Sequence, residues 1–221
     1  MKLLLLMLSL SLAAFANIGT ILAMHGNAQI HRANSSLTAR NGMDIQKGDE
    51  IVTQDKTKVQ IMLDDNTVIT IGPKSSFSFN DYFYDGSKRS KLSMRATRGF
   101  FRSVTGKIGK IAPERFKVRT NMATIGVRGT DFSAQLTADN AFYRCNRGEI
   151  SVTFADRVKY VSAGEMLQLQ MNGKKVKEKS MSKQGIDAQT QVLSDFDTIK
   201  VQDISEKKAD IQDVKYDCQQ H

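Results

Sequence analysis

The chain has 221 residues, which is enough for one sizeable domain or for one domain with an appendage. Its 32 lysines and arginines outnumber its 23 aspartates and glutamates, so the formal net charge is +9. Two cysteines allow only one disulfide bridge, which excludes a scaffold held by several bridges. Three histidines leave few general bases for an enzyme.

Residues 1–16 have the pattern of a secretory signal peptide. They read MKLLLLMLSLSLAAFA, with one cation at Lys2, an apolar run, and small residues at Ala14 and Ala16. The run is shorter than the roughly 20 residues needed to span a bilayer, and no second run of that length follows. We expect cleavage after Ala16 and a mature chain without a transmembrane segment, located in the periplasm or secreted. Residues 17–44 are polar with little periodicity, and we interpret them as an N-terminal approach to the domain.

Residues 45–170 consist of short alternating segments broken by Gly, Asp and Asn, which predicts strands throughout. The clearest pair is VQIML followed by VITI, joined by the polar turn of Asp64, Asp65 and Asn66. In KLSMRAT the alternation places Leu92 and Met94 on a buried side. We expect an all-β domain, either a β-solenoid or roll or a sandwich-like fold.

A basic segment runs from Lys88 to Lys110 without any aspartate or glutamate. Its cations on and after the KLSMRAT strand predict a basic face of Lys91, Arg95, Arg98 and Arg102. In an exported protein such a face would meet an envelope protein, an anionic glycan or lipid headgroups, and not nucleic acid. The alternative is a solvated face with no partner.

Residues 171–221 differ in composition from the domain. GKKVKEKSMSKQG, residues 173–185, reads as a basic linker, and apolar residues at helical spacing after it predict a marginal helical tail. Cys145 and Cys218 form the one candidate disulfide, which would tie this tail to the domain. Two unpaired thiols are the alternative.

No catalytic, cofactor or metal site is predicted. All three histidines lie in segments expected to be loose, so a nucleophile in the β domain has no visible base. The GKIGKIA stretch lacks the serine or threonine of a P-loop at Ile111, and the Asp64–Asn66 triplet is explained by turn chemistry. Gly126-Val127-Arg128-Gly129 matches the GXXG clamp of nucleic-acid-binding KH domains, but that clamp joins helices whereas this one joins strands.

The stretch TNMATIGVRGTDF resembles the signature T-x-x-A-x-x-G-V-R-G-T-x-F of the FecR domain family. The matching positions are Thr120, Ala123, Gly126, Val127, Arg128, Gly129, Thr130 and Phe132. KGDEIVT at 47–53 and VSAGEML at 161–167 bracket it in the family's order, so the resemblance covers roughly residues 45–170.

The resemblance implies a small β-solenoid or roll. Regulators of this family have a cytoplasmic anti-sigma segment and a membrane span before a periplasmic domain, whereas this chain has a signal peptide in their place. It is similar to stand-alone exported FecR-domain proteins, which implies a non-enzymatic module that senses or binds an envelope partner. A structural or adhesive surface component is the alternative.

The signature glycines are expected to serve tight backbone geometry. Arg128 has two interpretations, a partly buried guanidinium that bonds backbone oxygens or a surface recognition residue, and we favour the first.

Overall fold

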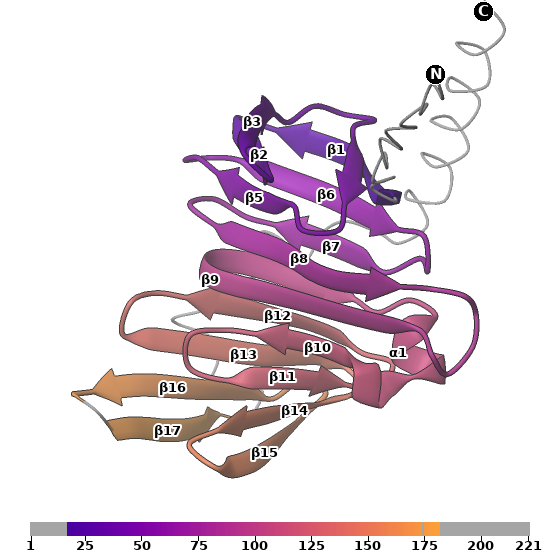
Figure 1. The fold of residues 1–221 in the computed structure, drawn as a ribbon. Helices are drawn as coiled ribbons and strands as arrows, with labels where there is room; N and C mark the ends of the chain where they lie inside the picture. The colour runs from indigo at the N-terminus through magenta and orange to yellow at the C-terminus, as the bar shows by residue number, and fades with distance from the viewer. Residues whose placement is uncertain (1–16, 174, 182–221) are drawn as a thin grey trace, which may run out of the picture.

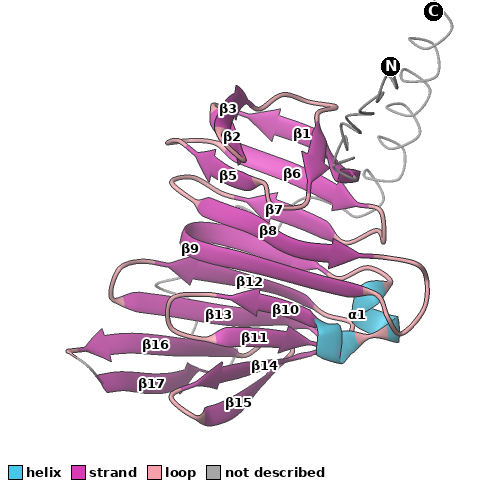
Figure 2. Ribbon diagram, in the orientation of Figure 1, coloured by secondary structure: helices cyan, strands magenta, loops and turns pink. Residues whose placement is uncertain are grey.

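The computed structural model describes residues 17–173 and 175–181, and these residues fold almost entirely into strands (Figures 1 and 2). The strands before the long central one are β1 (Asn17–His25), β2 (Ala28–Arg32), β3 (Ser35–Thr38), β4 (Asp44–Gln46), β5 (Glu50–Thr53), β6 (Lys58–Leu63), β7 (Val68–Ile71) and β8 (Ser76–Phe83). The central elements are β9 (Lys91–Val104), α1 (Ile108–Ile111) and the 3₁₀ turn η1 (Pro113–Arg115). The later strands are β10 (Phe116–Arg119), β11 (Thr124–Val127), β12 (Asp131–Leu136), β13 (Asn140–Arg147), β14 (Glu149–Phe154), β15 (Arg157–Ser162), β16 (Met166–Asn172) and β17 (Lys175–Met181). The predicted all-β class is confirmed, while the choice between a solenoid-like roll and a sandwich stays a prediction.

The strands pair in two sheets that share β9. We call one the groove sheet, with the order β3-β2-β5-β8-β9-β10-β11-β14-β15. The other, the back sheet, runs β4-β1-β6-β7-β9-β12-β13-β16-β17. All pairings are antiparallel except that of β9 with β10.

Strand β9 crosses from one sheet to the other at Gly99. Residues Lys91–Arg98 pair with β8, and residues from Gly99 onward pair with β12. Gly99 has φ +84°, and a Cβ there would lie 2.5 Å from the Ser75 Cα. Only glycine fits this corner, because a side chain would be strained by the backbone angle and would also overlap its neighbour.

One core cluster contains residues from both sheets, so the inner faces pack against each other. The expected buried side of KLSMRAT is confirmed, with Leu92, Met94 and Ala96 at most 1% exposed. At the crossing, Phe101 contacts Phe77 with ring centroids 5.3 Å apart and Phe132 at 5.9 Å. Edge and tilted ring contacts of this kind stabilise a core beyond the area that they bury.

The predicted hairpin at Val59–Ile71 is confirmed as β6 and β7 in register. Its turn residue Asp65 is fully buried and accepts hydrogen bonds from the Thr67 and Ile108 backbone amides at 3.1 and 3.0 Å. The carboxylate therefore anchors α1 to the hairpin. Asp65 in this turn therefore stabilises the fold.

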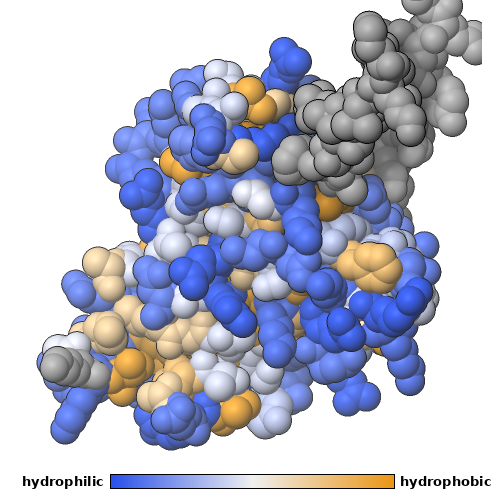
Figure 3. Space-filling model, viewed as in Figure 1, coloured by the Kyte–Doolittle hydropathy of each residue, from blue (hydrophilic) through white to orange (hydrophobic). Residues whose placement is uncertain are grey.

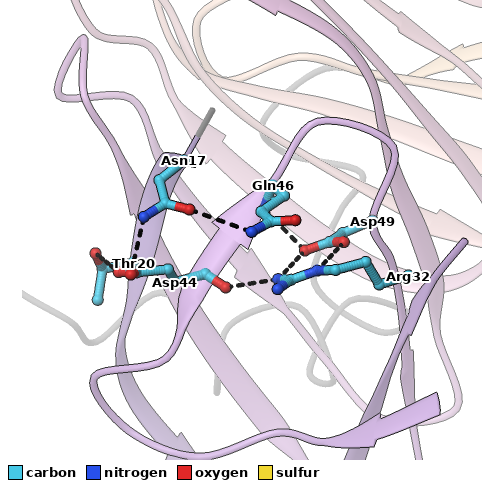
Figure 4. Close-up of polar contacts among 6 residues, drawn as sticks. All are labelled: Asn17, Thr20, Arg32, Asp44, Gln46 and Asp49. Carbon is cyan, nitrogen blue, oxygen red and sulfur yellow. Dashed lines mark hydrogen bonds and ion pairs between the residues drawn. The ribbon is translucent and has the colours of Figure 1, made fainter. Parts of the chain in front are cut away.

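The interpretation of residues 17–44 as an approach outside the β domain is wrong. Strand β1 pairs with β4 and β6, and β2 pairs with β5, so this segment is part of both sheets. Figure 4 shows the contacts that fasten it: Arg32 donates from Nε and Nη2 to the buried Asp49 carboxylate at 2.8 and 2.7 Å. The alternation of β1 is hidden in the sequence by a register shift between Ile21 and Ala23.

The predicted basic linker is also wrong for part of its length. Strand β17 pairs with β16 along its whole length, from Lys175 opposite Asn172 to Met181 opposite Met166. The predicted signal peptide at 1–16, the helical tail and Cys218 lie outside the described residues, so they stay predictions. Within the described part of the chain, no helix is long and apolar enough to cross a membrane.

Candidate functional site: a basic groove at the signature

The signature begins in a tight turn between β10 and β11. The Thr120 backbone amide donates to the Ala123 carbonyl at 2.8 Å, and the Thr120 hydroxyl also donates to that oxygen at 3.0 Å. The same hydroxyl lies 2.7 Å from the hydroxyl of Tyr143, which belongs to β13 in the back sheet. Burial raises the pKa of Tyr143 to about 12, so this link across the core is between neutral groups at neutral pH. Thr120 and Ala123 are therefore fold determinants.

The two signature glycines serve the fold in different ways. Gly126 lies within β11, where a Cβ would come 2.6 Å from the Ser151 Oγ of β14. Gly129 follows β11 with φ +62°, a conformation that favours glycine. The next residue, Thr130, is buried and accepts at its carbonyl from the Thr105 amide at 2.9 Å. Both expected uses of glycine, close approach and positive φ, are present.

The favoured interpretation of Arg128 is wrong. Its side chain is exposed, and it makes no hydrogen bond or ion pair with any residue that the structure describes. The turn is closed by the glycine backbone and by Thr105 and Thr130, so the guanidinium is not needed there. The second interpretation, a surface recognition residue, fits this position.

Arg128 lines an open groove of about 500 Å³ on the outer face of the groove sheet. Residues that alternate along β10, β11 and β14 form its floor and walls, chiefly Lys117, Arg119, Thr124, Gly126, Arg128 and Ser151. Gly126 makes the depression because it has no side chain between its cross-strand neighbours Lys117 and Ser151. The groove thus lies on the family signature itself.

The groove is positively charged, and the fold does not neutralise it. Lys117, Arg119 and Arg128 are exposed and have no ion-pair partner among the described residues, and Glu114 is the one acidic residue in the lining. Arg95 of β9 is also exposed and lies beside Arg119 in the β9–β10 ladder. Like charges directly opposite each other destabilise a sheet, so this pair is unfavourable for the fold alone.

The predicted basic face of Lys91, Arg95, Arg98 and Arg102 does not exist as one surface. Arg102 lies beyond the Gly99 corner, in the back sheet, where it donates two hydrogen bonds to Asp131 at 2.9 and 2.7 Å. Lys91 is paired with Asp81 at 2.6 Å, and this contact, followed by one from Lys47, lowers the pKa of the Asp81 carboxyl. Of these four residues, Arg95 and Arg98 alone are exposed and lack an ion-pair partner among the described residues.

Sequence reasoning missed Lys117, Arg119 and Ser151. The FKVR alternation places Lys117 and Arg119 on the outward side of β10, and that signal was available. What the sequence does not show is that β11 and β14 bring Gly126 and Ser151 beside Lys117.

An apolar edge borders the basic groove on the same face. Tyr160 and Val158 of β15 lie beside Ser151 and Thr153 of β14, and they are 66% and 50% exposed. Figure 3 shows mostly hydrophilic side chains over the upper strands and more apolar and near-neutral side chains in the lower left of this view. The face therefore combines cations, hydroxyl groups and an aromatic side chain.

Cys145 of β13 is buried, and its Sγ donates to the Gly148 carbonyl at 3.3 Å. Burial raises the pKa of this thiol to about 11. Its partner in the predicted bridge, Cys218, lies outside the described residues, so the bridge stays a prediction. Among the described residues, no group of three or more His, Cys, Asp or Glu side chains is placed to hold a metal ion.

Residues 49–151 match the family model described as FecR protein, and that range includes the signature and most of the groove. The chain carries a FecR domain. In this domain the matched range runs from the buried Asp49, immediately before β5, to Ser151 in the groove. No curated protein matches the chain.

Two crystal structures of a "putative anti-sigma factor" from Parabacteroides distasonis ATCC 8503, at 2.50 and 1.65 Å resolution, are similar to the chain in fold. Both are 18% identical to it, with TM-scores of 0.50 and 0.49. In each case the match covers 64% of this chain and 64% of the other. The first likeness shows a shared fold for the FecR domain and no more than that.

Proposed function

We propose that this chain is an exported signalling module that binds a protein partner in the bacterial cell envelope through the groove on its FecR domain. The observation that carries the proposal is the exposed Arg128. It is part of the family signature, it has no partner among the described residues, and it lines a groove with two further cations. A guanidinium without a hydrogen bond or ion pair among the described residues is available to bind a partner.

A sensing role by binding agrees with what is known of the relatives. FecR proteins act in regulation, and the structural neighbour is named as an anti-sigma factor. The groove offers cations, hydroxyl groups and a Gly126 depression, which are recognition groups and not a nucleophile with its base. We therefore infer that the module works by binding alone.

Export is supported by the N-terminal sequence. Residues 1–16 have the signal-peptide pattern, with the expected cleavage site after Ala16. The Asn17 side chain donates to Asp44 of β4 at 2.9 Å, so Asn17 belongs to the folded domain. A mass measurement of the protein purified from the periplasm or the medium tests this, since the mature chain is expected to begin at Asn17.

Site-specific photocrosslinking in living cells tests partner binding. A photoreactive amino acid at Ser151, in the groove, is expected to give a discrete adduct, whereas one at the exposed Thr38 of β3 is expected to give none. Arg128→Glu should reduce the Ser151 adduct, and Arg40→Glu, a change at an exposed arginine before β4, should not. Absence of a groove adduct, or equal adducts from both positions, would refute binding through the groove. Adducts that disappear when intact cells are treated with protease would favour a surface component.

A further inference from the structure

The cations of the groove have a regular spacing that is set by the sheet. Lys117 and Arg119 are alternate residues of β10, so they project from the same face about 6.8 Å apart along the strand. Arg95 lies next to Arg119 across the ladder, at the usual separation of about 4.8 Å between strands. These are fixed positions on a rigid element.

The hydroxyl groups extend the same rows away from the cations. Thr124 and Thr153 continue the row of Arg119, and Ser151 continues the row of Lys117 beyond Gly126. None of the three side chains makes a hydrogen bond with a described residue, so their donors and acceptors are available. The rows end at Val158 and Tyr160 on β15.

We propose that the groove binds an extended, acidic segment of the partner protein, in which carboxylates alternate with apolar side chains. The inference rests on the proposed function and adds the chemistry of the partner. An extended chain places every second side chain on one side, about 6.8 Å apart, which equals the separation of Lys117 and Arg119. Carboxylates of such a segment meet these cations, and its backbone amides and carbonyls can bond to the hydroxyl groups.

The apolar edge favours a protein segment over a uniformly charged polymer. Tyr160 and Val158 give apolar surface beside the hydroxyl rows, where an apolar side chain of the partner would be removed from water. Tyrosine and arginine are also the side chains that most often dominate protein interfaces. Gly126 leaves room for the partner backbone to approach the sheet.

Binding of a labelled synthetic peptide to the purified full chain tests the proposal. A peptide that alternates glutamate with valine is expected to bind, and the same peptide with glutamine for glutamate is expected to bind at least about tenfold more weakly. Lys117→Ala and Arg119→Ala should each weaken binding about 2- to 5-fold, as loss of an exposed ion pair does. Raising the salt concentration from about 0.1 M to 1 M, which shortens the Debye length from about 10 Å to 3 Å, should abolish most of the difference between the two peptides.

Matched variants separate a local effect from a loss of the fold. Arg40→Ala removes an exposed arginine between β3 of the groove sheet and β4 of the back sheet, and should leave peptide affinity unchanged. The double variant Lys117→Glu and Arg119→Glu should lose the acidic peptide and bind one that alternates lysine with valine. Equal binding of the glutamate and glutamine peptides would overturn the inference, and so would unchanged affinity in the alanine variants.

Two further probes decide between sources of negative charge. Polygalacturonate and phosphatidylglycerol vesicles are expected to bind less tightly than the acidic peptide and with little dependence on Arg119. Tight, Arg119-dependent binding of either, without peptide binding, would replace the protein segment by a glycan or a membrane. A groove crosslink to a protein together with no acidic peptide binding would refute only this inference, whereas absence of the crosslink would refute the proposed function.

Discussion

Arg128 and Arg102 are two arginines for which the structure predicts opposite effects of the same substitution. Arg128 is exposed and makes no hydrogen bond or ion pair with a described residue, so Arg128→Ala should change the free energy of unfolding by no more than about 0.5 kcal/mol. Arg102 and Asp131 are 14% and 13% exposed and form a two-point ion pair. Arg102→Ala leaves the Asp131 carboxylate nearly buried, with Asn146 at 3.3 Å as a remaining donor.

Removing one partner of a buried ion pair costs about 3–5 kcal/mol, and the remaining exposure and the Asn146 contact place this pair near the lower limit. A loss of about 3 kcal/mol corresponds to a fall in Tm of roughly 6–12 °C in a domain of about 150–250 residues. Arg128→Ala should shift Tm by about 2 °C or less on the same scale. Calorimetric scans of the two variants beside the unchanged protein give the comparison directly. Equal losses in both variants would show that Arg128 is a fold determinant, and the groove would lose its main recognition residue.

Three further predictions follow from the buried groups and the glycines. Gly126→Ala should leave Tm nearly unchanged, because only the Ser151 hydroxyl must move. Gly99→Ala should lower Tm strongly, because φ +84° and the Ser75 backbone both oppose a side chain at this position. Similar Tm values for the two variants would contradict this. The pKa of Tyr143 rises from 10.0 to about 12, so the neutral phenol stabilises the fold below pH 10. About 3 kcal/mol of the free energy of unfolding should therefore be lost as the pH rises from about 10 toward about 12. Urea unfolding at several pH values should show a smaller loss in Tyr143→Phe. Burial raises the pKa of Cys145 to about 11, so iodoacetamide at pH 8 should alkylate its thiol at least about tenfold more slowly in the folded chain than in urea. Equal alkylation rates in the two conditions, measured by peptide mapping, would contradict the burial of Cys145.

Those parts of the fold that depend on local patterns were predictable. The hairpin of β6 and β7 follows from period-two alternation on both sides of a polar turn, and the buried side of β9 follows from Leu92, Met94 and Ala96. Both signals are carried within a few consecutive residues. Gly129 was likewise interpreted correctly, since its positive φ favours glycine, whereas at Gly126 only the Ser151 hydroxyl opposes a side chain.

The first and last strands were missed because their stability comes from pairing. Strand β17 has alternating lysines and one glutamate, a composition with little strand preference, yet it pairs with β16 along its whole length and places Glu178 near Arg157 and Lys159 of β15. Strand β1 is more apolar, but its register shift breaks the alternation on which the prediction depends. In both cases the neighbouring strand decides the structure.

The position of the groove depends on the pairing of β10, β11 and β14. Arg95 and Arg102 of β9 are seven residues apart, so even a straight strand would place them on opposite faces. The positive φ at Gly99 sends Arg102 into the back sheet, where Asp131 neutralises it. The unpaired charge is then left on β10 and after β11, beside Arg95, where Gly126 opens the sheet surface. The pairing of β10 with β11 and of β11 with β14 places Lys117, Arg119 and Arg128 around Gly126, so the site follows from the ladder register and not from the charge of any single segment.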